Sequence, residues 1–351
     1  MAPNHLKPLF IRADATTDIG TGHVMRCLAL AQAWQDQGGE VTFISHCESD
    51  ALRQRLIDER MNPINISKPH PDPSDLDQTL KELSAISHQP SANCWIVIDG
   101  YHFDAVYQKT IKDAGYKILW IDDYGHAAHY YADLVLNQNI SAGETLYENR
   151  EPYTRLLLGT RYALLRREFK KWQGRVREIP TVARKVLITL GGGDPGNVTL
   201  KVLLALKQVD IPGLEAKIIV GPANPHLAVL ERVIAHDSDF QLITNASGMP
   251  GLMAWADIAI SAGGSTCWEL SFMGTPFLTI ILAENQRQSA YHLKAADMTM
   301  LINCQNDIVV AGMTAPLESI IGDGILRRKW SQKISAMIDG DGAKRVVEAM
   351  Y

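Results

Sequence analysis

The sequence has few cysteines, and none of them is part of a CxxC pair. The five are scattered through the 351 residues, at Cys27, Cys47, Cys94, Cys267 and Cys304. This usage excludes a disulfide scaffold and a cysteine-based zinc site, and it is typical of a reduced cytosolic protein. An apolar N-terminal leader and runs of about 18 apolar residues are also lacking, which argues against secretion and against a membrane as partner. We therefore expect a cytoplasmic protein.

The sequence also lacks an excess of positive charge, because its formal net charge is −5 at pH 7. A broad basic surface for nucleic acid is thus excluded, and the one basic run, residues 166–177, is interpreted as a solvated helix and linker. No HExxH motif or Cys/His cluster occurs, so we expect neither a metal nor a cofactor. No coiled-coil heptads are present; the oligomeric state stays open and is compatible with a monomer.

Apolar runs of strand length alternate with segments of helical periodicity along the whole chain. This alternation predicts α/β architecture with parallel sheets covered on both faces. The expected strands lie near residues 8–13, 41–45, 94–98, 117–121, 133–136 and 155–159, and then near 185–190, 216–220, 240–243, 257–261 and 276–282. In the first half, helices are expected near 23–37, 50–60, 76–86 and 104–114.

A charged, aperiodic stretch divides this pattern into two parts. We predict two doubly wound, Rossmann-type domains that face one another across a cleft, over residues 1–172 and 185–351, with a linker over 173–184. The last helical segment, roughly 325–350, is expected to be able to cross back onto the first domain.

A glycine turn follows the first expected strand and introduces a titratable side chain. In Gly20-Thr21-Gly22-His23 the turn opens a helix, and Arg26 lies one turn further along, near His23. The dinucleotide fingerprint is not matched, because Met25 stands where a third glycine is required. A neutral imidazole at the mouth of such a turn is a candidate general base, and the alternative is a structural histidine.

Polar residues follow other strands of the first half. Asp14 can orient the imidazole, bind substrate hydroxyls or cap its own turn, while Asp99 and Tyr101 end the expected strand near 94–98. Asp122 and Asp123 are adjacent on an extended chain and should point to opposite faces, so one metal ion held by both is not expected.

Three turns of the second half should converge at one sheet edge, beyond the carboxyl ends of the strands. They suit a diphosphate and the vicinal hydroxyls of a ribose, because small residues expose backbone N–H groups and a carboxylate accepts from two hydroxyls. The alternatives are that the glycines serve packing and that Ser265 and Thr266 are helix caps. The candidate residues are Gly192 in the first turn, Gly264, Ser265, Thr266 and Glu269 around the second, and Asn285 and Gln286 in the third.

These motifs together resemble the PseG family, the UDP-2,4-diacetamido-2,4,6-trideoxy-β-L-altropyranose hydrolases of pseudaminic acid biosynthesis. The second half alone resembles the broader group of MurG-like glycosyltransferases, which have the GT-B fold. The resemblance covers nearly the whole chain and lies in residues 11–14, 19–27, 97–101, 121–123, 136–139, 158–166, 191–195, 261–269 and 285–286. Departures are the third glycine, Gly193, and the polar, insert-like stretch 68–91.

The resemblance implies a GT-B fold and metal-independent hydrolysis of a UDP-sugar with water. It assigns to His23 the activation of water for an inverting attack on the anomeric carbon, with C–O cleavage. It puts the sugar near Asp14, Gly20, Gly22, Arg26, Asp99 and Tyr101. It puts the ribose on Glu269, the diphosphate near the turn of Gly263, Gly264, Ser265 and Thr266, and the uracil near Asn245 to Met249. Gly192, Asn285 and Gln286 are further expected UDP-binding residues. A GT-B glycosyltransferase with a UDP-sugar donor and a non-catalytic nucleotide-sugar binding protein remain the alternatives.

Overall fold

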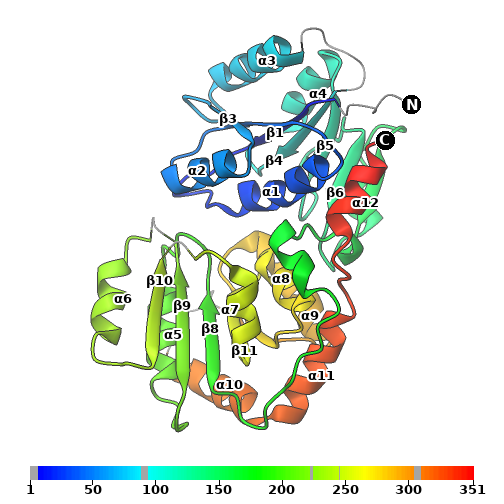
Figure 1. Ribbon diagram of the computed structural model, residues 1–351. Coiled ribbons are helices and arrows are strands. Elements are labelled where there is room, and N and C mark those ends of the chain that lie inside the picture. The colour runs from blue at the N-terminus through cyan, green and yellow to red at the C-terminus, as the bar shows by residue number, and fades with distance from the viewer. Residues whose placement is uncertain (1–6, 88–93, 222–223, 245, 304–309) are drawn as a thin grey trace. The chain divides into compact units, whose positions relative to one another are not determined.

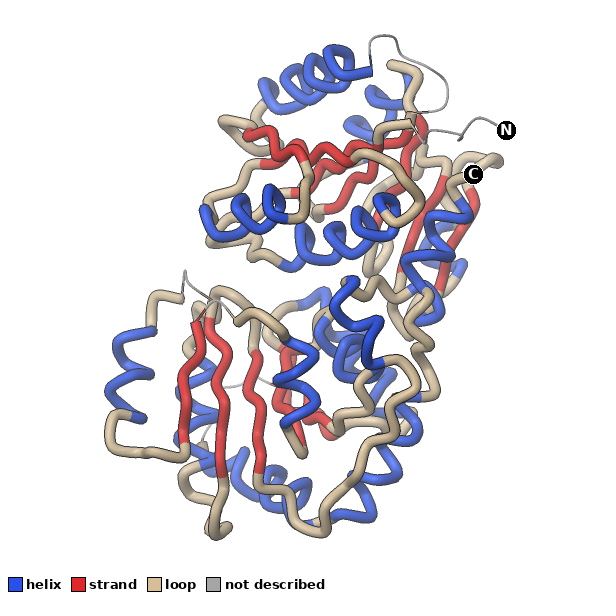
Figure 2. The backbone as a smooth tube through the Cα atoms, viewed as in Figure 1, coloured by secondary structure: helices blue, strands red, loops and turns tan. Residues whose placement is uncertain are grey.

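The computed structural model describes residues 7–87, 94–221, 224–244, 246–303 and 310–351. The chain forms two compact units: unit 1 comprises Met1–Arg167 together with Asp341–Tyr351, and unit 2 comprises Glu168–Gly340. The chain thus passes from unit 1 to unit 2 at Arg167, whereas the sequence suggested residue 172, and the stretch 173–184 belongs to unit 2. Each unit is a sheet with helices on both faces (Figures 1 and 2).

Unit 1 contains a seven-stranded sheet in which every pair of neighbouring strands is parallel. The chain leaves β1 toward one edge and later returns to its other side with β4, so the strand order reverses between β1 and β4. Such a reversal point is where open α/β sheets bind ligands. Across the sheet the order is β3 (Asn62–Asn65), β2 (Val41–Ser45), β1 (Leu9–Ala13), β4 (Trp95–Asp99), β5 (Lys117–Ile121), β6 (Leu134–Asn137) and β7 (Arg155–Leu158).

Two apolar cores, one on each face, hold the helices of unit 1 against its sheet. Successive side chains of β1 point to opposite faces of the sheet, so Leu9 and Ile11 belong to one core and Phe10 belongs to the other. The first core contains side chains of α1 (Gly22–Gln35), α2 (Asp50–Asp58) and α12 (Gly342–Ala349). The second contains side chains of α3 (Pro73–Ser87) and α4 (Ala105–Asp113). Most of the polar stretch 68–91 therefore forms the helix α3.

Unit 2 repeats this plan with a six-stranded parallel sheet and a strand order that reverses between β8 and β11. The order is β10 (Phe240–Thr244), β9 (Glu215–Val220), β8 (Lys185–Thr189), β11 (Ile258–Ala262), β12 (Phe277–Ile281) and β13 (Met300–Asn303). Its helices are α5 (Val198–Leu206), α6 (Leu227–Ile234), α7 (Met249–Trp255), α8 (Thr266–Phe272), α9 (Arg287–Ala295), α10 (Ala311–Gly322) and α11 (Gly324–Ser335). The predicted pair of doubly wound parallel sheets is confirmed.

Two edge strands were missed by the sequence analysis. The half-exposed β3 contains Pro63, and a proline makes a short run look unlike a strand although an edge strand tolerates it. The other, β13, has four residues and borders residues outside the described part of the chain. Among the described residues no helix is both long and apolar enough to cross a bilayer.

The expected last helix is two helices, and only the second, α12, belongs to unit 1. Val346, Val347 and Met350 of this segment are buried in the first core of unit 1. The Trp95 indole N–H donates to the carbonyl oxygen of Met350 at 2.9 Å, which fixes the end of the helix against β4.

We predict that Val346→Ala lowers the free energy of unfolding by about 1–3 kcal/mol, because it removes fully buried methyl groups and leaves a cavity. Urea unfolding measures the change. In the matched control Lys344→Ala, on the exposed side of α12, the change should stay within about 0.5 kcal/mol. Equal effects of the two substitutions would contradict the packing described for α12.

Candidate active site

The turn after β1 delivers His23 and Arg26 on the first turns of α1. Gly20 has φ +76°, a conformation that glycine adopts without strain, and α1 begins two residues later at Gly22. Thr21, at the N-cap position, makes no capping hydrogen bond with its side chain. The side chains of His23 and Arg26 are almost fully buried, and Arg26 Nη2 lies 3.4 Å from His23 Nδ1, so the two residues are neighbours as the helical spacing predicted.

Asp99, the last residue of β4, holds both of these side chains. Its Oδ1 lies 2.7 Å from His23 Nδ1, and its two oxygens accept from Arg26 Nη2 and Nε at 2.7 Å each. Burial would raise the pKa of Asp99, but the Arg26 guanidinium and His23 lower it well below its usual range. Because an ionised carboxylate only accepts hydrogen bonds, the contact requires His23 Nδ1 to carry a hydrogen.

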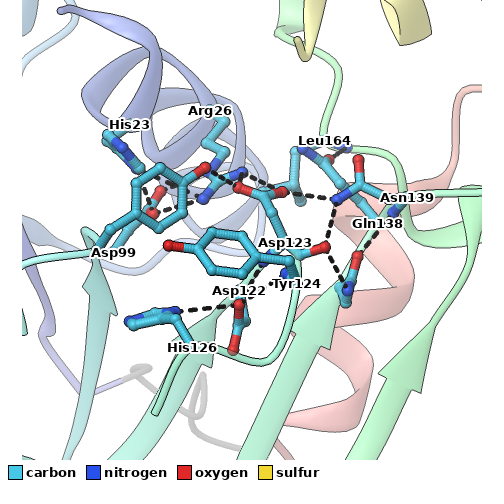
Figure 3. A network of polar contacts seen from close by, with 12 residues as sticks. His23, Arg26, Asp99, Asp122, Asp123, Tyr124, His126, Gln138, Asn139 and Leu164 are labelled. Atoms are coloured by element: carbon cyan, nitrogen blue, oxygen red, sulfur yellow. Dashed lines mark hydrogen bonds and ion pairs between the residues drawn. The ribbon is translucent and has the colours of Figure 1, made fainter. Parts of the chain in front are cut away.

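Arg26 also binds a second buried carboxylate, that of Asp123, just beyond β5 (Figure 3). Its Nη1 lies 2.9 and 2.8 Å from the two Asp123 oxygens. Tyr101 donates its hydroxyl to Asp123 Oδ2, and Asn139 Nδ2 donates to Oδ1 at 2.7 Å. The Tyr101 ring lies edge-on to the His23 imidazole, with 4.8 Å between ring centroids. The result is a closed network that fixes the imidazole.

This arrangement suits His23 for accepting a proton at its other nitrogen. Because Nδ1 carries the hydrogen that is bound to Asp99, Nε2 carries the lone pair that can accept a proton. Nε2 makes no hydrogen bond with any residue that the structure describes. Two carboxylates and one guanidinium give the network a charge of about −1 while the imidazole is neutral, and proton acceptance makes it electrically neutral. The same orientation of a histidine by a buried aspartate operates in hydrolytic triads.

The structure gives the orienting role to Asp99 and not to Asp14. Asp14 lies on the opposite face of the sheet edge, where Arg12 pairs with it and His102 Nε2 lies 2.9 Å from its Oδ2. The backbone N–H of His46 donates to its Oδ1 at 2.6 Å. Arg12 also pairs with Asp75 of α3, so this second buried cluster attaches α3 to the end of β1.

Arg26 was predicted to contact the substrate, and this stays a prediction. In the structure its Nε, Nη1 and Nη2 donate to Asp99 and Asp123, so it positions these two carboxylates. Asp123 and Asn139 were not among the predicted site residues. Each follows a buried strand, β5 and β6 respectively, and each lies in a stretch that carries the family resemblance, 121–123 or 136–139. The predicted opposite directions of the two adjacent aspartates agree with their separate contacts. Asp122 Oδ2 accepts from the Tyr130 hydroxyl at 2.6 Å, and Asp123 from Arg26.

Unit 2 brings its glycine turns together around the reversal point of its sheet. A Cβ on Gly263 would lie 3.1 Å from Gln286 Cβ, so the turns after β11 and β12 are in contact. Gln286 Oε1 accepts from the backbone N–H of Leu282 at 3.0 Å and holds its own turn, which includes Asn285 in η4 (Glu284–Gln286). A Cβ on Gly221 would overlap Gly192, so the turn after β8 packs closely against the end of β9.

Gly264 differs from these packed glycines. Its φ is not positive, and a Cβ placed on it meets no atom within 4 Å, so nothing in the described chain requires glycine there. The next residue, Ser265, stands at the N-cap position of α8 but makes no capping hydrogen bond with its side chain. Glu269 lies on the first turn of α8 and is partly exposed. An open backbone turn with hydroxyls beside it can accept an anionic ligand.

The turn after β8 is less open than expected. Asp194 accepts from the N–H groups of Val198 and Thr199 at 2.8 Å each, so the chain's own carboxylate fills the anion position at the start of α5. Met249 is the first residue of α7, and Asn245 lies outside the described residues. Within the described part of the chain, no group of three or more His, Cys, Asp or Glu side chains could hold a metal ion.

The turn that carries Asp123 depends on the ionised form of Asp122. Its Oδ1 accepts from the backbone N–H groups of residues 123, 124 and 125, at 2.6, 3.0 and 3.1 Å. Burial would raise the pKa of Asp122, but His126, Tyr130 and these N–H groups lower it from 3.8 to about 2. A depressed pKa stabilises the folded state above the unfolded pKa, and this contribution is lost as the pH falls from about 4 to about 2.

We predict that Asp122→Asn reduces the pH dependence of stability by about 2 kcal/mol between pH 7 and pH 2. The measurement is the free energy of unfolding in urea across this range. The control Asp113→Asn removes an exposed carboxylate and should retain the wild-type pH dependence. An unchanged pH profile in Asp122→Asn would show that the turn does not depend on the charge.

Comparison with known proteins gives one family model and several relatives. Residues 200–309 match the model of the glycosyltransferase family 28 C-terminal domain. An uncharacterized protein of Methanocaldococcus jannaschii is 27% identical over 79% of this chain, and the chain spans only 56% of that protein. The spore coat polysaccharide biosynthesis protein SpsG of Bacillus subtilis is 29% identical over 80% of this chain and 79% of its own length.

A third relative carries the name that the sequence motifs suggested. The UDP-2,4-diacetamido-2,4,6-trideoxy-β-L-altropyranose hydrolase of Campylobacter jejuni is 27% identical over 81% of this chain and 95% of its own length. Among solved structures, Acinetobacter baumannii MurG matches with a TM-score of 0.63 at 13% identity, covering 98% of this chain and 99% of MurG. A UDP co-structure of S. aureus MnaA matches with a TM-score of 0.66 at 12% identity, covering 97% and 95%. The chain is therefore similar over most of its length to a hydrolase with the name that its motifs indicated, and it has the fold of MurG-like GT-B glycosyltransferases.

Proposed function

We propose that this protein hydrolyses a UDP-linked 2,4-diacetamido-2,4,6-trideoxyhexose to UDP and the free sugar, a step of pseudaminic acid biosynthesis. The observation that carries the proposal is the His23 imidazole, oriented by the ionised Asp99 with Nε2 left as proton acceptor. The names of the Campylobacter jejuni relative and of a bifunctional Helicobacter pylori relative support the substrate class.

In the proposed step, His23 Nε2 takes a proton from water while the water oxygen attacks the anomeric carbon. The bond from that carbon to the oxygen of the β-phosphate breaks, and UDP leaves with the electron pair. Attack from the face opposite to UDP inverts the anomeric configuration. Asp99 stabilises the imidazolium that forms, and the proton then passes to solvent. Water and the UDP-sugar are the only reactants, and the step balances without an oxidant or a reductant.

The proposal assigns the nucleotide to unit 2. The turn at Gly264, Ser265 and Thr266 receives the diphosphate on backbone N–H groups and hydroxyls, and Glu269 receives the ribose hydroxyls. Asn285 and Gln286 border this turn, and the start of α7 at Met249 contributes to the base site. Backbone donors of this kind also stabilise the charge that develops on UDP as it leaves.

We predict that His23→Asn lowers the rate of UDP release by about 10²–10⁴-fold, because the variant cannot accept the proton. The dissociation constant for UDP should remain close to that of the wild type. A coupled assay for UDP measures the rate, and calorimetry measures the affinity. The expected anomer can be followed in the same reaction by NMR.

The matched control is His129→Asn, which removes a different histidine of unit 1, one paired with Glu151 at 3.1 Å. It should retain wild-type activity. Asp99→Asn should lose activity like His23→Asn, since the amide cannot fix the Nδ1–H tautomer. Full activity of His23→Asn would overturn the proposed mechanism.

We further predict that Gly264→Ala weakens UDP binding at least about tenfold, because a methyl group would occupy the space that the diphosphate needs. The chain itself has room for this methyl group, so the thermal midpoint should not fall. Gly312→Ala in α10 is the control, with equal room for a Cβ and no proposed nucleotide contact, and should leave UDP affinity unchanged. Unaltered UDP affinity in Gly264→Ala would remove the diphosphate from this turn.

A second candidate is a glycosyltransferase that uses the same donor. The match to the family 28 C-terminal domain and the similarity to MurG favour it. Incubation with the UDP-sugar alone separates the two functions: a hydrolase releases free sugar at its full rate, and a transferase without acceptor does so only slowly.

A further inference from the structure

The carboxylates beside His23 have no free hydrogen-bonding capacity for a sugar. Each oxygen of Asp99 has two partners: His23 and Arg26 at Oδ1, and Arg26 and Cys27 at Oδ2. Each oxygen of Asp123 likewise accepts twice, from Arg26 and either Asn139 or Tyr101. A sugar next to the imidazole therefore cannot use these oxygens for its hydroxyl groups without breaking the network.

Aromatic rings lie beside this saturated network. Tyr101 is 5.3 Å from Tyr124 and 5.6 Å from His126 between ring centroids, and Tyr124 is 5.6 Å from His126. We call these three rings the aromatic face. Tyr101 connects this face to the imidazole of His23, at 4.8 Å. Both tyrosines are partly exposed, so the face can contact a ligand.

The backbone of Tyr124 is fixed by hydrogen bonds, and its side-chain hydroxyl can donate to a ligand. Its N–H and that of Gly125 donate to Asp122, which fixes the turn that presents the ring. The Tyr124 hydroxyl makes no hydrogen bond with any residue in the described part of the chain. Partial burial, with Asp122 and Asp123 nearby, raises the pKa of Tyr124, so the hydroxyl stays protonated and able to donate. Figure 3 shows this side chain in front of the Asp122–Asp123 turn, with its hydroxyl directed away from Asn139.

We propose that Tyr124 determines sugar specificity: its ring packs against the methyl groups of an acetylated, 6-deoxygenated hexose, and its hydroxyl donates to an acetamido carbonyl oxygen. This inference rests on the proposed function, because it concerns the sugar of that reaction. Replacement of sugar hydroxyls by methyl and acetamido groups matches a site whose acceptors are saturated and whose exposed surface is aromatic. A fully hydroxylated hexose would leave its donors without partners there.

The test compares two substitutions of Tyr124 on two substrates. Tyr124→Leu keeps an apolar side chain without the ring, and Tyr124→Phe removes only the hydroxyl. For the UDP-diacetamidotrideoxyhexose we expect KM to rise about tenfold in Tyr124→Leu and about threefold in Tyr124→Phe, with kcat reduced less than twofold. With UDP-N-acetylglucosamine, which retains its 6-hydroxyl, the preference of the enzyme for the trideoxy sugar should shrink by the same factor.

Tyr153→Leu is the control, because Tyr153 is an exposed tyrosine of unit 1 outside the network. It should leave both substrates unchanged. A loss confined to kcat in Tyr124→Leu, or an equal rise in KM for both substrates, would overturn the specificity role. Unchanged kinetics would also overturn it.

A binding measurement separates this inference from the proposed hydrolysis. In the His23→Asn background, the ratio of the dissociation constants for UDP and for the intact UDP-sugar reports the contribution of the sugar alone. Tyr124→Leu should reduce that ratio about tenfold while the affinity for UDP stays constant. If the wild type does not release UDP from this sugar, the hydrolase proposal fails, yet a reduced ratio still supports Tyr124 as a sugar contact. An unchanged ratio rejects Tyr124 even if hydrolysis is observed.

Discussion

The Arg26 guanidinium compensates the charge of two carboxylates that are buried at the ends of the central strands of unit 1. Asp99 and Asp123 are buried, and burial of unpaired carboxylates is costly. Arg26 lies between them with two donors on one side and one on the other. By doing so it joins α1 to the ends of β4 and β5, and it keeps Asp99 ionised for its contact with His23. The same ion pairs that compensate the buried carboxylates therefore also fix the orientation of the His23 imidazole.

The sequence was sufficient for the two parallel sheets apart from the edge strands β3 and β13, and for the proximity of His23 and Arg26, because both follow from local periodicity. It could not decide between Asp14 and Asp99 as the partner of the imidazole. That choice depends on strand register: Ala13 lies level with Asp99, so Asp14 is one residue further on and points to the other face. Asp123 and Asn139 were missed for a related reason, since their proximity to Arg26 requires the order in which β5 and β6 join the sheet.

The two units present chemical groups in different ways. Around His23 in unit 1, side chains satisfy one another, which gives a rigid, preorganised imidazole and leaves aromatic rings as the accessible surface. In unit 2, the turn after β11 contains Gly264, which no chain atom approaches, and Ser265, whose hydroxyl makes no capping hydrogen bond. In the turn after β8, by contrast, Asp194 accepts from the N–H groups at the start of α5. In the sequence these two glycine turns look equivalent, because a carboxylate four residues before a helical N–H can either cap the helix itself or border a ligand site.

The placement of α12 has a consequence for how the chain folds during synthesis. Unit 1 begins with the first strand, yet part of its first core is supplied by Val346 and Val347. Unit 2 is continuous in sequence, so its core, which includes Trp330 of α11, needs no segment that is translated after Gly340. Until α12 has been translated, unit 1 lacks the helix that packs against α1. The unit that is translated first is therefore the one that is completed last, and until then apolar surface on α1 is open to intermolecular contacts.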